Sequence, residues 1–165
     1  MNIFYLSNNP VKCAQYHCDK HVVKMVVETA QLLSTAHRVL DEPCDLPVYK
    51  ATHKNHPSAI WCRQSSNNYN WLWYLLRSLC VEYTYRYDKI HKCQHSGLLD
   101  TLMNTPKNIA IGQFTEPPPA MPDEYKTSSA IQSYMNYYNG AKRSFATWKR
   151  RQPPAWFIND HIHKD

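Results

Sequence analysis

Charged and polar side chains recur at helical spacing near the start of the chain, within an otherwise apolar stretch. They are His17, Lys20, His21, Lys24, Glu28 and Gln31. Steps of three and four residues place them on one side of a helix. One interpretation is a solvated face, in which Lys24 and Glu28 form an ion pair that contributes about 0.3–0.5 kcal/mol. The other is a cleft, where partial burial shifts proton affinities and brings acid, base and anion-binding groups together.

Two kinds of nucleophile lie in this stripe. Lys20 or Lys24, desolvated in a cleft and close to the other, would act as an amine nucleophile, although holding a phosphate is the commoner use of such lysines. Cys18, beside Lys20 and His21, is the candidate thiol, but most free cysteines are buried small hydrophobes. The sequence therefore favours phosphate binding by the lysines.

Histidines and cysteines also cluster, but not at the spacings of a known metal site. The cluster consists of Cys13, His17, Cys18 and His21, and a separate HxxH pair consists of His53 and His56. Neither group matches a paired-cysteine finger or the HExxH helix of metalloproteases. We therefore predict no metal ion and no other cofactor.

The last quarter of the chain, residues 142–165, is basic and aromatic. Its candidate nucleic-acid-binding residues are Lys142, Arg143, Lys149, Arg150 and Arg151, with Trp148 and Trp156 nearby. Such cations suit a DNA backbone, and flat rings suit unstacked bases. The alternative for Tyr134, Tyr137, Phe145 and Trp148, which lie at helical spacing, is a place in the core, and for these four we favour it.

Composition limits the fold that positions these groups. The chain has 165 residues, with 3 glycines and 11 prolines, and a formal net charge of +6, which suits an anionic partner such as nucleic acid. Few glycines and many prolines predict an all-α fold, a compact single-domain helical bundle over residues 1–165 with long proline-rich loops. They also exclude a P-loop or dinucleotide fingerprint. Because no signal peptide or membrane-spanning run is present, we expect a cytoplasmic protein with six free thiols and no membrane contact.

Local signals place the helices. A long central helix is predicted from Asn9 to Leu40, with Asn8 or Asn9 as its cap and Pro10 in its first turn. Residues 1–6 form a strand or an extended arm tucked under the helices. Later helices are predicted from His56, from Tyr69 to about His91, from Leu98 to Met103, and from Ser128 or Ser129, with a possible break at Asn139-Gly140. One of Ser65, Ser66, Asn67 and Asn68 should cap the second of these, and its exposed end should carry Glu82, Arg86 and Lys89.

The polar stripe belongs to a longer pattern, shared with a known family. The runs Lys20-His21-Val22-Val23-Lys24, Val27-Glu28 and Gln31-Leu32-Leu33 resemble the K-R-L-x-K-x-x-V-E-x-x-Q-x-L pattern of bacterial and phage pyrimidine-dimer DNA glycosylases of the endonuclease V type. Their second and third helical segments are similar to His56-Pro57 with Trp61, and to Tyr69, Leu72, Glu82-Tyr83 and Arg86-Tyr87. The resemblance covers about residues 1–92.

This resemblance implies a compact all-helical protein that binds duplex DNA, kinks it and displaces a base. In the family's well-studied members, the N-terminal α-amine attacks the sugar C1′ and forms a Schiff base, a helix glutamate stabilises the sugar cation, and basic neighbours hold phosphates. An α-amine titrates near pH 8, so a fair fraction is nucleophilic at neutral pH. The implied function is that of a DNA glycosylase and AP lyase.

Carried onto this sequence, the resemblance gives a set of candidate site residues. The amine belongs to Met1 or Asn2, and the size of Asn2 disfavours removal of the initiator methionine. Lys20 and Lys24 match basic positions, while His21 stands where the motif has its catalytic glutamate, and Glu28 is the nearest carboxylate. We expect His56 and Trp61 to line the same pocket, and Arg63 to contact nucleic acid. Two other functions stay open: a non-catalytic nucleic-acid-binding protein, and an enzyme that modifies an already altered base or nucleotide.

Overall fold

The computed structural model of the chain describes residues 1–158, which form seven α-helices, one short 3-10 helix and no strand. The helices are α1 (Pro10–Tyr16), α2 (Asp19–Leu40), α3 (Pro57–Gln64), α4 (Ser66–Tyr87), α5 (Lys92–His95), α6 (Leu98–Leu102) and α7 (Ala130–Gly140), and η1 (Asp123–Tyr125) precedes α7. The predicted all-α class is confirmed. α5 was not predicted, because its four residues are too few to show a helical period.

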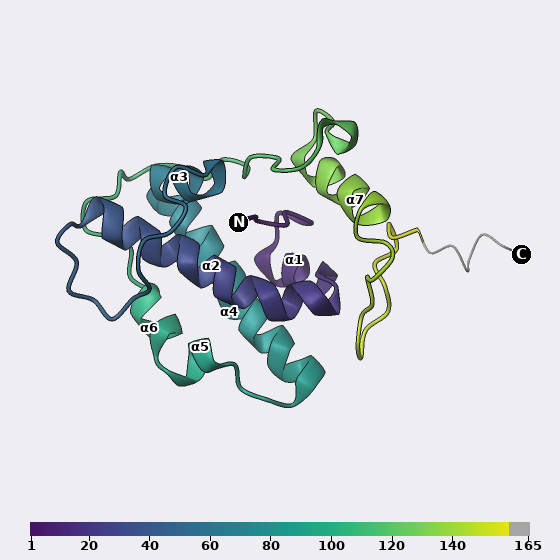
Figure 1. The fold of residues 1–165 in the computed structure, drawn as a ribbon, viewed down its shortest axis with the longest axis horizontal. Helices are drawn as coiled ribbons and strands as arrows, with labels where there is room; N and C mark the ends of the chain where they lie inside the picture. The colour runs from purple at the N-terminus through teal and green to yellow at the C-terminus, as the bar shows by residue number, and fades with distance from the viewer. Residues whose placement is uncertain (159–165) are drawn as a thin grey trace, which may run out of the picture.

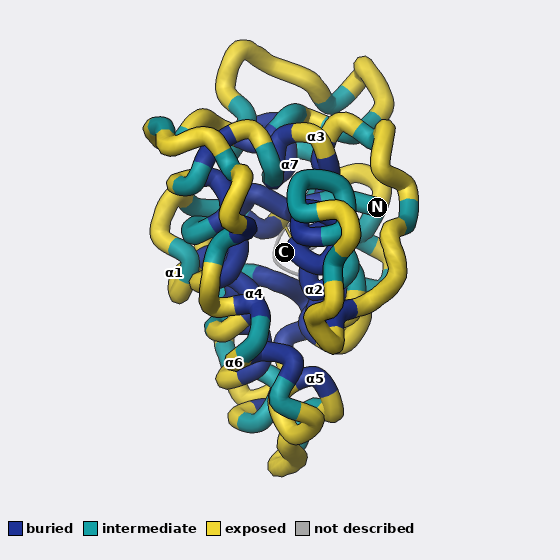
Figure 2. Tube along the Cα trace, turned by 90° about the vertical axis from the view of Figure 1, so that its left-hand side faces the viewer, coloured by how far each residue is buried: buried dark blue, intermediate teal, exposed yellow. Residues whose placement is uncertain are grey.

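The two longest helices, α2 and α4, cross at the centre of the molecule (Figure 1). α1 packs on α4, α3 packs against both long helices, and α5 and α6 close one end. Buried residues follow α2 and α4 where these helices face each other (Figure 2). The core therefore runs along the crossing, and α2 presents its remaining face to the other elements and to solvent.

Side-chain caps fix most helix starts at the residues that the sequence indicates. Asn9 accepts the N–H of Lys12, Ser65 accepts that of Asn68, and Ser129 accepts that of Gln132. His56 caps α3 in the same way, with its Nδ1 accepting the N–H of Ser58. Each cap satisfies a backbone donor that the first helical turn leaves free.

The predicted continuous helix from Asn9 to Leu40 is wrong, because the chain breaks at His17 and Cys18. Both residues have extended backbone, with ψ of 133° and 162°. The carbonyls of Gln15 and His17, freed by the break, accept hydrogen bonds at 3.0 and 2.8 Å from the guanidinium of Arg86. Distant groups thus satisfy the interrupted helix, and no local signal in the sequence announces them.

The expectation that Glu82 and Arg86 lie at an exposed helix end is also wrong. They are 2% and 1% exposed, and only Lys89 of that group lies at the surface. Arg86 donates to Glu82 at 2.7 Å and to Asp19 at 3.0 Å, and Arg151 donates from the other side to both oxygens of Glu82. Charges can be buried here because each is paired and hydrogen-bonded.

The first six residues form an extended arm, one of the two predicted alternatives, and not a strand. From Ile3 to Leu6 the arm is at most 5% exposed. It runs between the long helices and α7 (Figure 1), and the ring of Phe4 contacts those of Tyr134 and Tyr138 on α7. The arm therefore brings the chain's N-terminus to the exposed side of α2.

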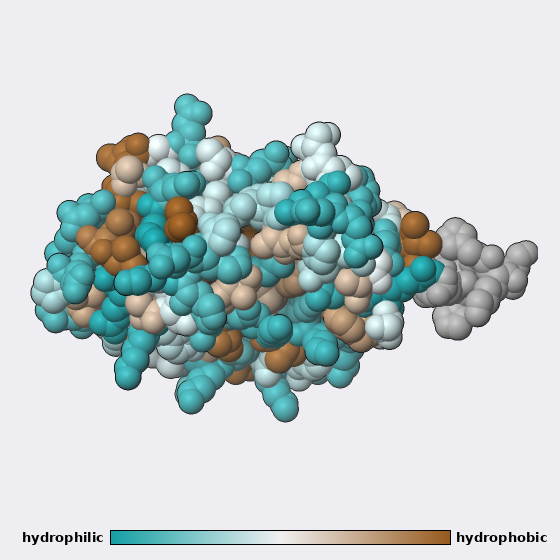
Figure 3. Space-filling model, turned by 45° about the horizontal axis from the view of Figure 1, so that its top comes forward, coloured by the Kyte–Doolittle hydropathy of each residue, from teal (hydrophilic) through white to brown (hydrophobic). Residues whose placement is uncertain are grey.

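The surface is mainly hydrophilic, and the apolar side chains on the face shown in Figure 3 lie in separate spots. Among the described residues, no helix combines the length and the apolar character that a membrane span requires. All six cysteines are free thiols, as predicted.

Candidate active site

The N-terminal amine lies against the middle of α2. The Met1 nitrogen is 3.5 Å from Oε1 of Glu28, and Nζ of Lys24, one turn earlier, is 3.8 Å from Oε2 of the same carboxylate. The predicted ion pair between Lys24 and Glu28 is therefore present, and a second cation joins it from the arm. Two amines and one carboxylate meet at this point.

Exposure differs sharply among these three groups. The side chain of Met1 is 3% exposed, that of Glu28 is 16% exposed, and that of Lys24 is 65% exposed. Oε2 of Glu28 is buried and accepts no hydrogen bond. The carboxylate therefore keeps an acceptor that the fold leaves unused, beside an amine held at the edge of the core. The stripe on α2 is thus partly a solvated face, at Lys24, and partly enclosed, at Glu28.

His56 lies close enough to this cluster to sense its charge. Burial and the positive charge of the N-terminal amine lower the pKa of His56. Because its Nδ1 accepts the N–H of Ser58, the neutral ring carries its proton on Nε2. His56 is therefore a neutral hydrogen-bond donor near the amine. Trp61, which was predicted to line the same pocket, has its N–H already bonded within the fold.

Trp61 belongs to the core. It is 3% exposed, and its Nε1 donates to the carbonyl of Thr115 at 3.0 Å. Its ring contacts those of Trp71 and Phe114. Arg63, two residues later on α3, is half-buried. Contact of Trp61 and Arg63 with DNA stays a prediction.

His21 lies on the same side of α2 as Glu28 but two turns before it, about 10 Å away along the helix axis. Its ring stacks on Phe4 at 4.1 Å, and its Nδ1 lies 2.6 Å from the hydroxyl of Tyr138. Burial, reinforced by the charges of His17 and Lys142, lowers the pKa of His21 to about 2. The ring is therefore neutral near pH 7, and in the structure it serves as a packed partner of the arm.

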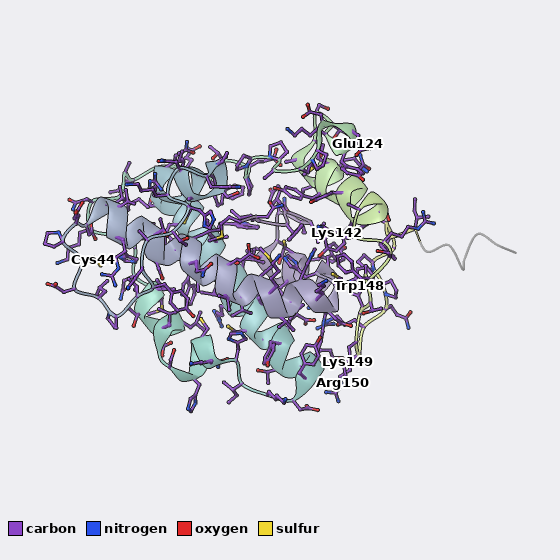
Figure 4. All side chains as sticks on the ribbon, viewed as in Figure 1. Cys44, Glu124, Lys142, Trp148, Lys149 and Arg150 are labelled. Carbon is purple, nitrogen blue, oxygen red and sulfur yellow. The ribbon has the colours of Figure 1, made fainter. Side chains whose placement is uncertain are left out.

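Two further cations gather next to His21. Nζ of Lys20 lies 4.6 Å from the ring centre of Phe145, and Nζ of Lys142 lies 4.7 Å from that of Tyr137 and 5.9 Å from that of Phe145. Lys142 follows α7 and faces the start of α2 (Figure 4). With Lys24, these amines form a basic surface beside the N-terminus, which we call the lysine surface (Lys20, Lys24 and Lys142).

The other predicted DNA-binding cations differ in exposure and in whether they are paired with acceptors of the protein. Lys149 is exposed and lies over the ring of Tyr87, while Arg150 donates to Tyr85 O and Asp88. Arg151 is held by Glu82, as described above, and Arg143 is half-buried. Lys149 and Arg150 lie near the end of α4 (Figure 4), apart from Lys142. The final part of the predicted basic segment, residues 159–165, lies outside the described residues.

Asn2 holds the arm in place, a role that the sequence did not indicate. Its Oδ1 accepts from Ile3 N at 2.8 Å and from the Tyr134 hydroxyl at 3.0 Å, and its Nδ2 donates to Ala120 O at 2.9 Å. Tyr134 is 132 positions away, so no local pattern could connect the two. The side chain of Asn2 thus anchors the arm to Ala120 and Tyr134.

The family model of the pyrimidine dimer DNA glycosylases matches residues 1–95. This range holds the arm, Lys24, Glu28 and His56, and it covers more than half of the 165 residues. The chain belongs to the pyrimidine dimer DNA glycosylase family. The predicted resemblance is confirmed, and with it a glycosylase-type function in DNA repair, with DNA as the substrate of the family.

The comparisons with individual proteins add no relative of this glycosylase family member. No curated protein and no solved structure matches the chain. Among residues 1–158, no three His, Cys, Asp or Glu side chains converge as a metal site would require. The site is therefore built from amines, one carboxylate and neutral histidines.

Proposed function

We propose that this protein is a DNA N-glycosylase with AP-lyase activity, and that the α-amine of Met1 is its nucleophile. The observation that carries the proposal is the position of this amine, 3.5 Å from Glu28 and next to Lys24. An amine and a carboxylate at this distance form a nucleophile with its own acid-base partner. The partner would be duplex DNA with a damaged pyrimidine, displaced from the stack because its C1′ is otherwise inaccessible.

The chemistry requires one amine and no external oxidant or reductant. The unprotonated Met1 nitrogen forms a bond to C1′ as the glycosidic C1′–N bond breaks, and the base leaves with the electron pair and gains a proton. The amine loses a proton, the C1′–O4′ bond breaks as the nitrogen lone pair forms the C=N⁺ bond of an iminium ion, and O4′ takes up a proton to become a hydroxyl. Loss of a C2′ proton then expels the 3′ phosphate, which is the lyase step. Hydrolysis of the remaining imine would release the enzyme.

Glu28 would serve this reaction through Oε2, the oxygen that accepts no hydrogen bond in the fold. A carboxylate beside C1′ stabilises the positive charge that develops on the sugar as the base leaves. The same group can accept the proton that the amine loses. Lys24, which is largely exposed, and Lys20 would hold a phosphate next to the reacting sugar, as a flexible ammonium can.

The lysine surface would place the DNA backbone across the N-terminus. Lys142 adds a cation from outside the family-matched segment, and the aromatic rings of Tyr137 and Phe145 hold Lys142 and Lys20 in place. Release of counterions from the neutralised phosphates would supply affinity without sequence preference. Recognition of damage would then depend on how readily the base leaves the stack.

The direct test is borohydride trapping of the Schiff base. The full chain is incubated with two labelled duplexes, one with a cyclobutane pyrimidine dimer and one with an abasic site, and adducts are mapped by mass spectrometry. We expect a covalent adduct on the Met1 nitrogen with both duplexes. The matched variants are Glu28→Gln, which removes the carboxylate charge, and Glu124→Gln on η1, which changes an exposed carboxylate away from the site (Figure 4).

The outcomes separate the alternatives. An adduct on Met1 that Glu28→Gln abolishes and Glu124→Gln preserves supports the proposal. An adduct on Lys20 or Lys24 would overturn the assignment of the nucleophile. Tight binding of both duplexes without any adduct would overturn the enzyme and favour a non-catalytic binding protein.

A further inference from the structure

The side chain of Asn2 makes three hydrogen bonds that leave it no freedom to turn. Oδ1 accepts from the backbone of Ile3 and from the hydroxyl of Tyr134, and Nδ2 donates to the carbonyl of Ala120. One bond joins the side chain to the backbone of the next residue, and two reach segments more than a hundred residues away. Asn2, the residue next to the amine, is thus hydrogen-bonded to Ala120 and Tyr134.

Tyr134 is a rigid partner for this contact. It is 0% exposed, and its hydroxyl lies 2.8 Å from Pro118 O, 3.2 Å from Ala120 N and 3.0 Å from Asn2 Oδ1. The hydroxyl accepts the N–H of Ala120, and its single proton lies between two acceptors, Pro118 O and Asn2 Oδ1. The ring is held by α7, so its hydroxyl has a fixed place relative to the arm.

We infer that Asn2 and Tyr134 are positioning residues that hold the Met1 amine against Glu28, an inference that rests on the proposed function. Neither side chain touches the carboxylate or the position of the reacting sugar. They act through the backbone, because Asn2 follows Met1 directly and fixes where the amine can lie. A displacement of about 1 Å in such an arrangement can reduce the rate about a hundredfold.

The part of the chain that the family model leaves uncovered thereby has a role at the site. Pro118, Ala120 and Tyr134 all follow residue 95, where the match ends. The matched segment supplies the amine and the carboxylate, and the unmatched segment sets the distance between them. Removal of the initiator methionine would defeat this arrangement, because the new amine would lie one residue further along, about 3.8 Å between Cα atoms.

The experiment measures the trapping rate for Tyr134→Phe, Asn2→Leu and the double variant, using the full chain and the abasic duplex. Leu at position 2 is close to Asn in size and keeps Met1, which mass spectrometry verifies. The matched control is Tyr69→Phe, which removes an equally buried hydroxyl, bonded to His37 and Leu102 instead. A measurement independent of DNA follows the rate at which an amine-reactive reagent labels Met1.

We expect each single variant to lower the trapping rate at saturating DNA by about tenfold to a hundredfold, with the half-saturating DNA concentration unchanged. The double variant should lose less than the product of the two single effects, because both singles remove the hydrogen bond between the two side chains. Labelling of Met1 should become faster in both variants and stay unchanged in Tyr69→Phe. Equal effects of Tyr134→Phe and Tyr69→Phe would overturn the positioning role, as would additive losses in the double variant. If the wild-type protein forms no adduct, the proposed function fails, and the labelling rates alone decide whether the amine is held.

Discussion

Arg86 and Glu82, one turn apart on α4, form a 2.7 Å ion pair while both side chains are almost fully enclosed. The same guanidinium also closes the gap between α1 and α2 by donating to His17 O. Arg86→Ala should therefore lower the free energy of unfolding by about 3–5 kcal/mol, because it leaves a buried carboxylate without this partner.

Urea unfolding checks this prediction. Arg77→Ala, an exposed arginine on the same helix, should change the free energy of unfolding by about 0.5 kcal/mol or less. Similar losses for the two variants would show that the buried network contributes little to stability.

Glu28→Gln should reduce base excision by a factor of about 10² to 10⁴, the usual range for loss of an acid-base group. The amide keeps the size of the side chain and removes its charge, so the affinity for DNA should change little. Single-turnover excision from a dimer-containing duplex gives the rate, and fluorescence anisotropy gives the affinity. A loss of affinity that accounted for the whole loss of activity would assign Glu28 to binding.

Acid should weaken the fold through its buried histidines. Burial lowers the pKa of His17 to about 4 and that of His21 to about 2, from 6.5. Below pH 6.5 these histidines bind protons in the unfolded chain but not in the folded chain. Their contribution to the free energy of unfolding is therefore complete above pH 6.5 and is lost as the pH falls. Between pH 6 and pH 5, each of these histidines should cost about 1.4 kcal/mol per pH unit.

Urea midpoints at several pH values in this window measure the effect while most carboxylates remain ionised. His17→Asn should make the pH dependence shallower by about the share of one histidine. His53→Gln, at an exposed position, should leave it unchanged. A stability that is flat from pH 6.5 to pH 5 would contradict the neutral state of both rings.

Lys142 and Arg151 should differ in how they affect DNA binding. Lys142 is packed on aromatic rings with its charge uncompensated in the contacts described, whereas Arg151 is paired with Glu82. Lys142→Ala should lower affinity and reduce the slope of log K against log salt by about 1. Arg151→Ala should mainly lower stability. Anisotropy titrations at several salt concentrations measure the slope for each variant. A reduced slope for Arg151→Ala would contradict the prediction and assign Arg151 to the DNA interface.

Local chemistry made much of the fold predictable. Asn9, Ser65 and Ser129 accept a backbone N–H within three residues, and such contacts depend on nearby sequence alone. The break at His17 was not predictable, because the group that compensates for it is Arg86, 69 positions away. Likewise, helical spacing places Arg86 beside Glu82 but could not show that Arg151, 69 positions away, pairs with the same carboxylate.

The candidate site likewise combines one contact that local sequence predicts and one that depends on tertiary structure. Spacing by four predicted that Lys24 and Glu28 meet, and the structure has them 3.8 Å apart. The contact between Glu28 and Met1 depends on the arm, whose path is set by packing against α7. Helical spacing therefore predicted the contact between Lys24 and Glu28, and tertiary structure was needed to show that Glu28, rather than His21, lies next to the amine.

The arm has a consequence for the order of events during synthesis. Asn2 leaves the ribosome early, and Tyr134, its partner, follows 132 positions later. Until the final helix has emerged, the amine of the nascent chain has no fixed place beside Glu28. A product that stopped before α7 would carry every group of the α2 cluster and still lack the contact that holds the arm. The N-terminal amine is therefore positioned only after α7 has joined the fold.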